Sequence, residues 1–165
     1  MKGFMRPEVN LRHLEDGSVS LDDQMTPEEL DVGVEDSLIH VKEPLKYDLE
    51  VQQMEDGLLV QGTLRLTLDC ECARCLKPMR HKLDFDAWAA HIPLQGEDEA
   101  AVVNDVVDLT PYVREDIVLA FPQRPLCEPD CKGLPGVPPA AELGASKDAP
   151  LASNPWAELN KLKLK

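Results

Sequence analysis

Five cysteines, grouped in two short runs, are the residues of this sequence best suited to chemistry. Cys72 and Cys75 are separated by two residues, and Cys127 and Cys131 by three. Two close pairs of thiolates can hold a zinc ion tetrahedrally, with each sulfur about 2.3 Å from the metal. The sequence therefore predicts a zinc site that joins the two runs. The alternative is a turn whose cysteines bind no metal.

Other residues with reactive side chains offer less. Cys70 is interpreted as a thiol at a strand end outside the site, and His81 and His91 could replace a thiolate but are more typical of partly exposed strand positions. Carboxylate pairs such as Glu28 and Glu29 occur without a neighbouring His or Lys pattern for acid–base catalysis. The sequence contains no phosphate-binding glycine loop, nucleophile elbow or His-Glu-x-x-His motif. We therefore expect that the protein is not an enzyme.

The composition indicates one acidic globular domain with tails. Of 165 residues, 43% are hydrophobic but only 4% are aromatic, so the core must be built from Leu, Val, Ile and Ala. No segment has the length of a signal peptide or a membrane span, which leads us to expect a cytoplasmic protein with reduced thiols and no membrane partner. The 17 basic and 31 acidic residues give a net charge of −14, which argues against non-specific binding to DNA or RNA. Contact with RNA would have to be local or made through a protein partner.

The cysteines are positioned by an antiparallel meander. Alternation of apolar and polar residues predicts strands over residues 45–52, 60–68 and about 81–91, the first two joined by an Asp-Gly turn. Gly62 interrupts the inward row of the second strand, which indicates a bulge or a close backbone approach. In the third strand the alternation places Trp88 on the solvent side. The first cysteine run then falls at the turn between the second and third strands.

Helical signals flank this meander. A short strand is expected within 9–14, and Thr26 begins a capping box for a helix of one or two turns that ends at Gly33. Thr110 is expected to cap an amphipathic helix that extends to Phe121. The predicted fold class is α+β: an antiparallel β-sheet meander with one main packed helix, a short N-terminal helix and a C-terminal tail helix.

The chain is expected to divide into three parts. Residues 1–133 form a single α+β domain, and 134–153 form a Pro/Ala-rich linker whose composition favours disorder. Residues 154–165 form a short basic amphipathic helix capped by Asn154.

Two places combine positive charge in this acidic chain. One is a basic run beside the first cysteine pair, where an exposed positive end would be a focused contact point for RNA or a partner, unless its side chains are ordinary solvated ones. The other is the last segment, which could contact RNA phosphates or a partner groove, or could instead dock on the protein's own domain. The residues concerned are Arg74, Lys77, Arg80, Lys82, Trp156, Lys161 and Lys163.

Four segments taken together resemble the YceD-like family, bacterial and plastid proteins named for large ribosomal RNA subunit accumulation. The matching segments are residues 66–76, 107–122, 127–134 and 154–163. The resemblance implies a non-enzymatic role in the synthesis, processing or stability of large-subunit (23S) ribosomal RNA. The resemblance also implies that the partner is this RNA or a pre-ribosomal protein. It places the two cysteine pairs in two knuckles. Many members carry a further cysteine pair where this chain has residues 135–138, so a metal site here would use four thiols only.

Two other classes of function stay open on the sequence. One is an adaptor whose zinc staple shapes a binding face unrelated to ribosomes. The other is a cysteine-based enzyme or redox protein, which requires an unusually acidic thiol. The sequence does not predict the oligomeric state.

Overall fold

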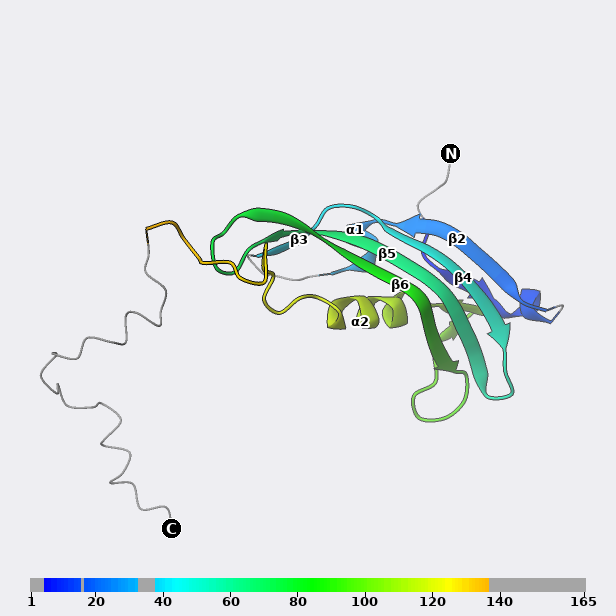
Figure 1. Ribbon diagram of the computed structural model, residues 1–165. Coiled ribbons are helices and arrows are strands. Elements are labelled where there is room, and N and C mark those ends of the chain that lie inside the picture. The colour runs from blue at the N-terminus through cyan, green and yellow to red at the C-terminus, as the bar shows by residue number, and fades with distance from the viewer. Residues whose placement is uncertain (1–4, 16, 33–37, 137–165) are drawn as a thin grey trace, which may run out of the picture. The chain divides into compact units, whose positions relative to one another are not determined.

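A computed structural model describes residues 5–15, 17–32 and 38–136 of the chain (Figure 1). All the elements named below belong to one compact unit that ends at Cys131. Strands hold 46% of the described residues and helices 14%, and among the described helices only one has seven or more residues. The protein is therefore mainly β, and the expected α+β class with a main packed helix is wrong. No helix in the described ranges is long and apolar enough to cross a bilayer.

A five-stranded antiparallel sheet forms the body of the molecule. Strands β4 and β3 follow one another along one edge of β5, and each pairs with a different part of it. Strand β2 pairs with the other edge of β4, and β6 pairs with β5 along its other edge. Figure 1 shows β5 and β6 as one long hairpin, with helix α2 on one side of it. The three strands that the alternation predicts are confirmed as β4, β5 and β6. The bounds are β2 Val19–Met25, β3 Ile39–Val41, β4 Leu45–Gln53, β5 Gly57–Glu71 and β6 Pro78–Pro93.

A second, three-stranded sheet and three short helices complete the described fold. The sheet has the order β1-β8-β7, and its strands are only two or three residues long. The strand expected within 9–14 is confined to β1, because the chain turns directly into the 3₁₀ helix η1. The bounds are β1 Glu8–Asn10, η1 Leu11–Leu14, α1 Pro27–Leu30, β7 Val102–Val103, β8 Val106–Asp108 and α2 Thr110–Leu119.

The two helix starts differ in how they are capped. The capping box of α1 is confirmed: Thr26 Oγ1 accepts from the Glu29 N–H at 3.2 Å, and Glu29 Oε2 accepts from the Thr26 N–H at 3.0 Å. At α2 the predicted cap is wrong by position. Thr110 is already helical, and its N–H donates to Asp108 Oδ1 at 2.8 Å. The N-cap residue is Leu109, which makes no side-chain cap bond, and Asp108 accepts only from the first helical N–H.

Alternation along β4 builds the core. Leu45, Tyr47, Leu49 and Val51 are buried and the residues between them are exposed, as predicted. Helix α2 contributes the fully buried Ile117 to the same core cluster. Each aliphatic side chain buried in this way stabilises the fold by about 1.5–3 kcal/mol.

A bulge in the β5–β6 hairpin changes which residues of β6 face inward. Gly62 pairs with Trp88 and Leu64 with Phe85, so two residues of β6 lie opposite Thr63. The extra residue shifts the alternation by one, which is the general effect of a bulge. Trp88 is therefore buried at 5% exposure, contrary to its predicted solvent position.

Candidate metal centre

The first cysteine pair lies in a closed turn between β5 and β6. The Cys72 carbonyl accepts from the Leu76 N–H at 2.8 Å, and the Cys72 N–H donates to the Lys77 carbonyl at 2.9 Å. Leu76 has a φ of 59°, a left-handed conformation that lets the chain reverse. One more backbone bond, from the Ala73 N–H to the Pro125 carbonyl at 2.8 Å, holds the segment after α2 against this turn. The turn and the second cysteine run are thus joined before any metal is considered.

The structure brings the four sulfurs of the predicted set together. The Sγ atoms of Cys72 and Cys131 are 3.8 Å apart, and those of Cys75 and Cys127 are 3.7 Å apart. All four sulfurs lie within 4.8 Å of one another. Four sulfurs at about 2.3 Å from a central zinc ion would lie about 3.8 Å apart at the corners of a tetrahedron. The Cys72–Cys131 and Cys75–Cys127 distances match this spacing, and the four sulfurs together could hold a zinc ion.

The environment of Cys72 favours its thiolate form. Cys72 is fully buried, and backbone N–H groups of Cys127, Arg74 and Cys75 stabilise its thiolate and lower the pKa of Cys72 to about 6. Burial and the neighbouring thiols raise the pKa of Cys127 to about 12. A metal ion would displace the remaining protons, because zinc binds thiolates.

The other candidate ligands lie outside the cluster. Within the described residues, the only group of metal-binding side chains is the four-cysteine set. Cys70 is buried in the core on β5, and His91 Nε2 lies 3.2 Å from Asp56 Oδ1. Four thiolates and no fifth donor suit a closed structural zinc site, which leaves no open coordination position for a substrate.

Several basic side chains lie on or beside this turn. Some of them have a partner within the described chain and others form no ion pair there. We call residues 72–82 the hairpin tip. Arg74 Nη1 donates to the Cys131 carbonyl at 2.9 Å, and Arg80 forms ion pairs with Glu43 and Asp69. The side chains of Lys77 and Lys82 form no ion pair within the part of the chain that the structure describes. Trp156, Lys161 and Lys163 lie outside the described residues.

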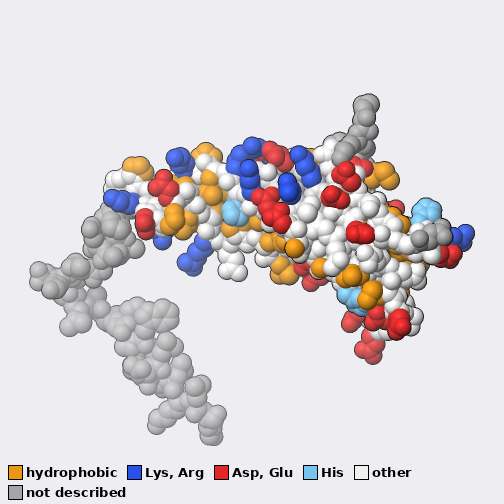
Figure 2. Space-filling view, turned by 45° about the vertical axis from the view of Figure 1, so that its right-hand side comes forward, with side chains coloured by type: hydrophobic (Ala, Val, Ile, Leu, Met, Phe, Trp, Pro, Cys, Tyr) orange, Lys and Arg blue, Asp and Glu red, His pale blue; other side chains and the backbone are white. Residues whose placement is uncertain are grey.

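Figure 2 shows Lys and Arg side chains, with some Asp and Glu among them, at the end of the molecule that carries the hairpin tip, and a group of Asp and Glu side chains at the opposite end. Sequence reasoning missed the carboxylates that neutralise Arg80. Counting the register back from the turn would have placed Asp69 opposite Arg80, as observed. No local signal points to Glu43, which comes from the loop between β3 and β4.

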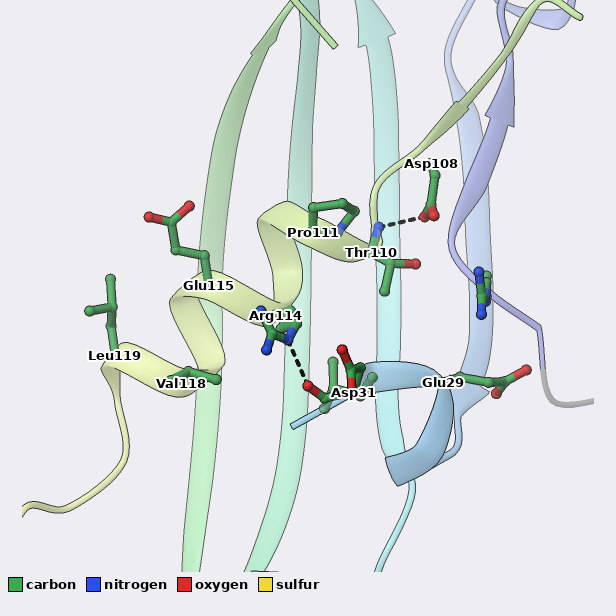
Figure 3. Close-up of a pocket in the computed structure, with 11 residues that line it drawn as sticks. Glu29, Asp31, Asp108, Thr110, Pro111, Arg114, Glu115, Val118 and Leu119 are labelled. Carbon is green, nitrogen blue, oxygen red and sulfur yellow. Dashed lines mark hydrogen bonds between the residues drawn. The ribbon is translucent and has the colours of Figure 1, made fainter. Parts of the chain in front are cut away.

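A separate pocket of about 670 Å³ lies between α1 and α2 (Figure 3). Arg114 Nε crosses it to donate to the Asp31 carbonyl at 2.8 Å, and so ties α2 to the end of α1. The lining contains arginine and carboxylate side chains but no cysteine, histidine or lysine. It therefore holds no nucleophile paired with a base, and its carboxylates do not form a metal-binding group.

Comparison with known proteins identifies the family. Residues 60–163 match the model of the large ribosomal RNA subunit accumulation protein YceD. The chain belongs to the YceD family. The matched region includes both cysteine pairs, the hairpin tip and α2.

The curated relatives do not add a function to this membership of the YceD family. Uncharacterized proteins of Mycobacterium bovis and Mycobacterium tuberculosis are 33% identical over 111 residues, which cover 61% of this chain and 54% of theirs. An uncharacterized protein of Mycobacterium leprae is 26% identical over 123 residues, covering 70% of this chain and 54% of its own length. The chain thus spans about half the length of the curated relatives it matches. No solved structure matches it.

Proposed function

We propose that this protein is a non-enzymatic factor that supports the synthesis, processing or stability of large-subunit (23S) ribosomal RNA during assembly of the large subunit. The observation that carries the proposal is the match to the YceD family over residues 60–163. The four-cysteine cluster agrees with a role without catalysis, because a closed tetrathiolate site fixes structure and offers no open position for chemistry. We place this role in the cytoplasm, where thiols stay reduced.

In this proposal a zinc ion bound by Cys72, Cys75, Cys127 and Cys131 shapes the contact surface. The ion would fasten the hairpin tip to the segment that follows α2, across a link already made by the Ala73 N–H and the Pro125 carbonyl. Arg74 adds a second brace by donating to the Cys131 carbonyl. The metal supplies rigidity, and the chain's own residues present the charge.

The proposed partner is large-subunit ribosomal RNA or a pre-ribosomal protein, and contact is made at the hairpin tip. The net charge of −14 opposes any broad contact with phosphates, so a local positive surface is required. Arg74 and Arg80 are occupied by the Cys131 carbonyl and by carboxylates, respectively. Lys77 and Lys82 are the exposed tip lysines whose charges are not neutralised by an ion pair within the described chain. They are therefore the residues on which the contact is expected to depend most.

Sedimentation of cell extracts tests the proposal. A tagged protein should co-migrate with immature large subunits, and its depletion should lower large-subunit RNA relative to small-subunit RNA. Lys77→Glu should weaken co-migration, while Lys46→Glu, the same charge change at an exposed position on β4, should leave it unchanged. A protein that stays in the light fractions, with normal RNA ratios after depletion, would overturn the ribosomal role and favour an adaptor unrelated to ribosomes.

A further inference from the structure

Strand β6 has one long edge without a partner in the described part of the chain. It pairs only with β5, over almost its whole length. No described loop makes a backbone hydrogen bond to residues 79–92 on the other edge. Such an edge presents a row of unpaired N–H and C=O groups to which another strand can add.

The exposed face of β6 carries its charges in a self-complementary order. Arg80 and Lys82 are followed by Asp84 and Asp86, and all four side chains are exposed on the same face. In an antiparallel pair of identical strands centred on Leu83, Lys82 lies opposite Asp84 of the other copy. Arg80 would come near Asp86 of the other copy, which is the first of the two bulged residues opposite Thr63. Opposite charges directly across two strands stabilise their pairing.

This order also fixes the register. Charges on an edge strand usually prevent pairing because like charges meet. A shift of the centre to residue 84 would place Asp84 against Asp84, and a shift to residue 82 would place Lys82 against Lys82. Of these three registers, only the pairing centred on Leu83 places Lys82 of each copy against Asp84 of the other.

The two central charges are available for such a contact. Arg80 and Asp86 each have an ion-pair partner within their own chain, Asp86 with Arg65 at 3.7 Å. Lys82 and Asp84 have none within the described residues. The bulge opposite Thr63 consists of Asp86 and Ala87, so the regular pairing of β6 from the hairpin tip ends at Phe85. Lys82 and Asp84 both lie within this regular stretch, and Asp86 lies just outside it.

An exposed apolar side chain accompanies this edge. Trp88 of β6 donates its indole N–H to Asp116 of α2 at 2.6 Å, so this side of α2 faces β6. Leu119 follows three residues later on the same side of the helix and is 76% exposed. Figure 3 draws Leu119 among the residues that line the pocket between α1 and α2.

We propose that two copies of this chain associate through β6, in antiparallel pairing about a two-fold axis at Leu83. The two five-stranded sheets become continuous across the axis, and two Lys82–Asp84 pairs form at its centre. A two-fold interface of this kind uses the same surface on both copies. The inference does not rest on the ribosomal role, and it concerns the purified protein alone.

Charge exchange at the two central positions tests this dimer. Sedimentation equilibrium in about 0.15 M salt, where exposed charges still interact over about 8 Å, should show a concentration-dependent dimer of the wild-type chain. Lys82→Glu places a glutamate opposite Asp84 of the other copy. Asp84→Lys places a lysine opposite Lys82 of the other copy. Each change should weaken association about tenfold or more. The double variant Lys82→Glu/Asp84→Lys restores opposite charges and should dimerise again.

Mixing the two single variants gives the sharpest result. The Lys82→Glu chain carries two acids and the Asp84→Lys chain two lysines, so they should form a mixed dimer although neither pairs with itself. Lys46→Glu, on β4, should dimerise as the wild type does, and circular dichroism should show that all variants are folded. A wild-type chain that remains monomeric, or single variants that dimerise as well as the wild type, would overturn the proposal.

Discussion

At the scale of single residues, the phenol of Tyr47 shows how burial and nearby acids act on one group. Tyr47 is buried on β4 and donates its hydroxyl to the Met5 carbonyl at 2.9 Å. Burial, followed by the charges of Asp23, Glu29 and Asp22, raises the pKa of Tyr47 to about 12. The folded protein thus favours the neutral phenol more strongly than the unfolded chain does.

This shift predicts a change in alkaline stability. The unfolded pKa is about 10, so the contribution of the neutral phenol is complete below that pH and is lost as the pH rises towards 12. Tyr47→Phe should lower the free energy of unfolding at pH 7 by about 1 kcal/mol through loss of the hydrogen bond. It should also flatten the decline between pH 10 and 12. Urea unfolding across this range, compared for both proteins, measures the difference; parallel curves would contradict the assigned shift.

The hydroxyl of Thr110, unlike that of Tyr47, has no hydrogen-bond partner in the described structure. It is 8% exposed, and its Oγ1 is buried without a hydrogen bond in the described structure. An unpaired buried hydroxyl costs about 1–3 kcal/mol, and valine has nearly the same shape. Thr110→Val should therefore raise the free energy of unfolding by about 1 kcal/mol, seen as a higher melting temperature. A lower melting temperature would mean that the hydroxyl has a partner in solution.

The sequence predicts the members of the cysteine cluster better than it predicts their surroundings. Spacing within each run is enough to pair Cys72 with Cys75 and Cys127 with Cys131, since ligands of one zinc ion come in close pairs. Spacing says nothing about the N–H groups that lower the pKa of Cys72, because these depend on how the second run is placed against the first. Distant partners of this kind require the fold.

At the scale of elements, the strands with one buried face are predictable and the shortest ones are not. The alternation along β4 survives into the structure because every second residue enters the core. Strands β7 and β8 have two and three residues, too few to show a period. The predicted class was wrong because strands hold 46% of the described residues and helices only 14%. The bulge was indicated by Gly62, but its effect on Trp88 depends on the extra residue of β6, which only the register shows.

The bulge also gives the sharpest test at this scale. A Cβ atom added to Gly62 would lie 2.0 Å from the Asp48 carbonyl oxygen on the neighbouring strand. Gly62→Ala should therefore cost at least about 3 kcal/mol, from a backbone clash added to strain at its φ of 155°. Gly96 also has a positive φ but has open space around it, so Gly96→Ala should cost about 1 kcal/mol. Urea unfolding compares the two, and equal losses would contradict the close approach of β4 and β5.

At the scale of the whole molecule, the candidate metal centre lies at the end of the longest hairpin. Strand β5 has 15 residues, and at about 3.3 Å per residue it spans about 50 Å. The buried core is distributed along the sheets and α2, and the buried Cys72 lies outside the core cluster. A metal at this end therefore holds a local structure that the core does not reach.

This arrangement predicts that metal loss is a local event. Native mass spectrometry should find one zinc ion per chain, absent after Cys72→Ser or Cys127→Ser and retained after Cys70→Ala, since Cys70 lies outside the cluster. On chelation, amide hydrogen exchange should accelerate in residues 72–77 and 125–131 and remain slow in β4, because structural sites of this kind hold turns that lack their own core. Acceleration throughout the sheets would mean that the ion supports the entire fold. Unchanged exchange in a metal-free chain would mean that zinc does not hold these turns. The backbone hydrogen bond between Ala73 and Pro125 would then be what joins the two segments.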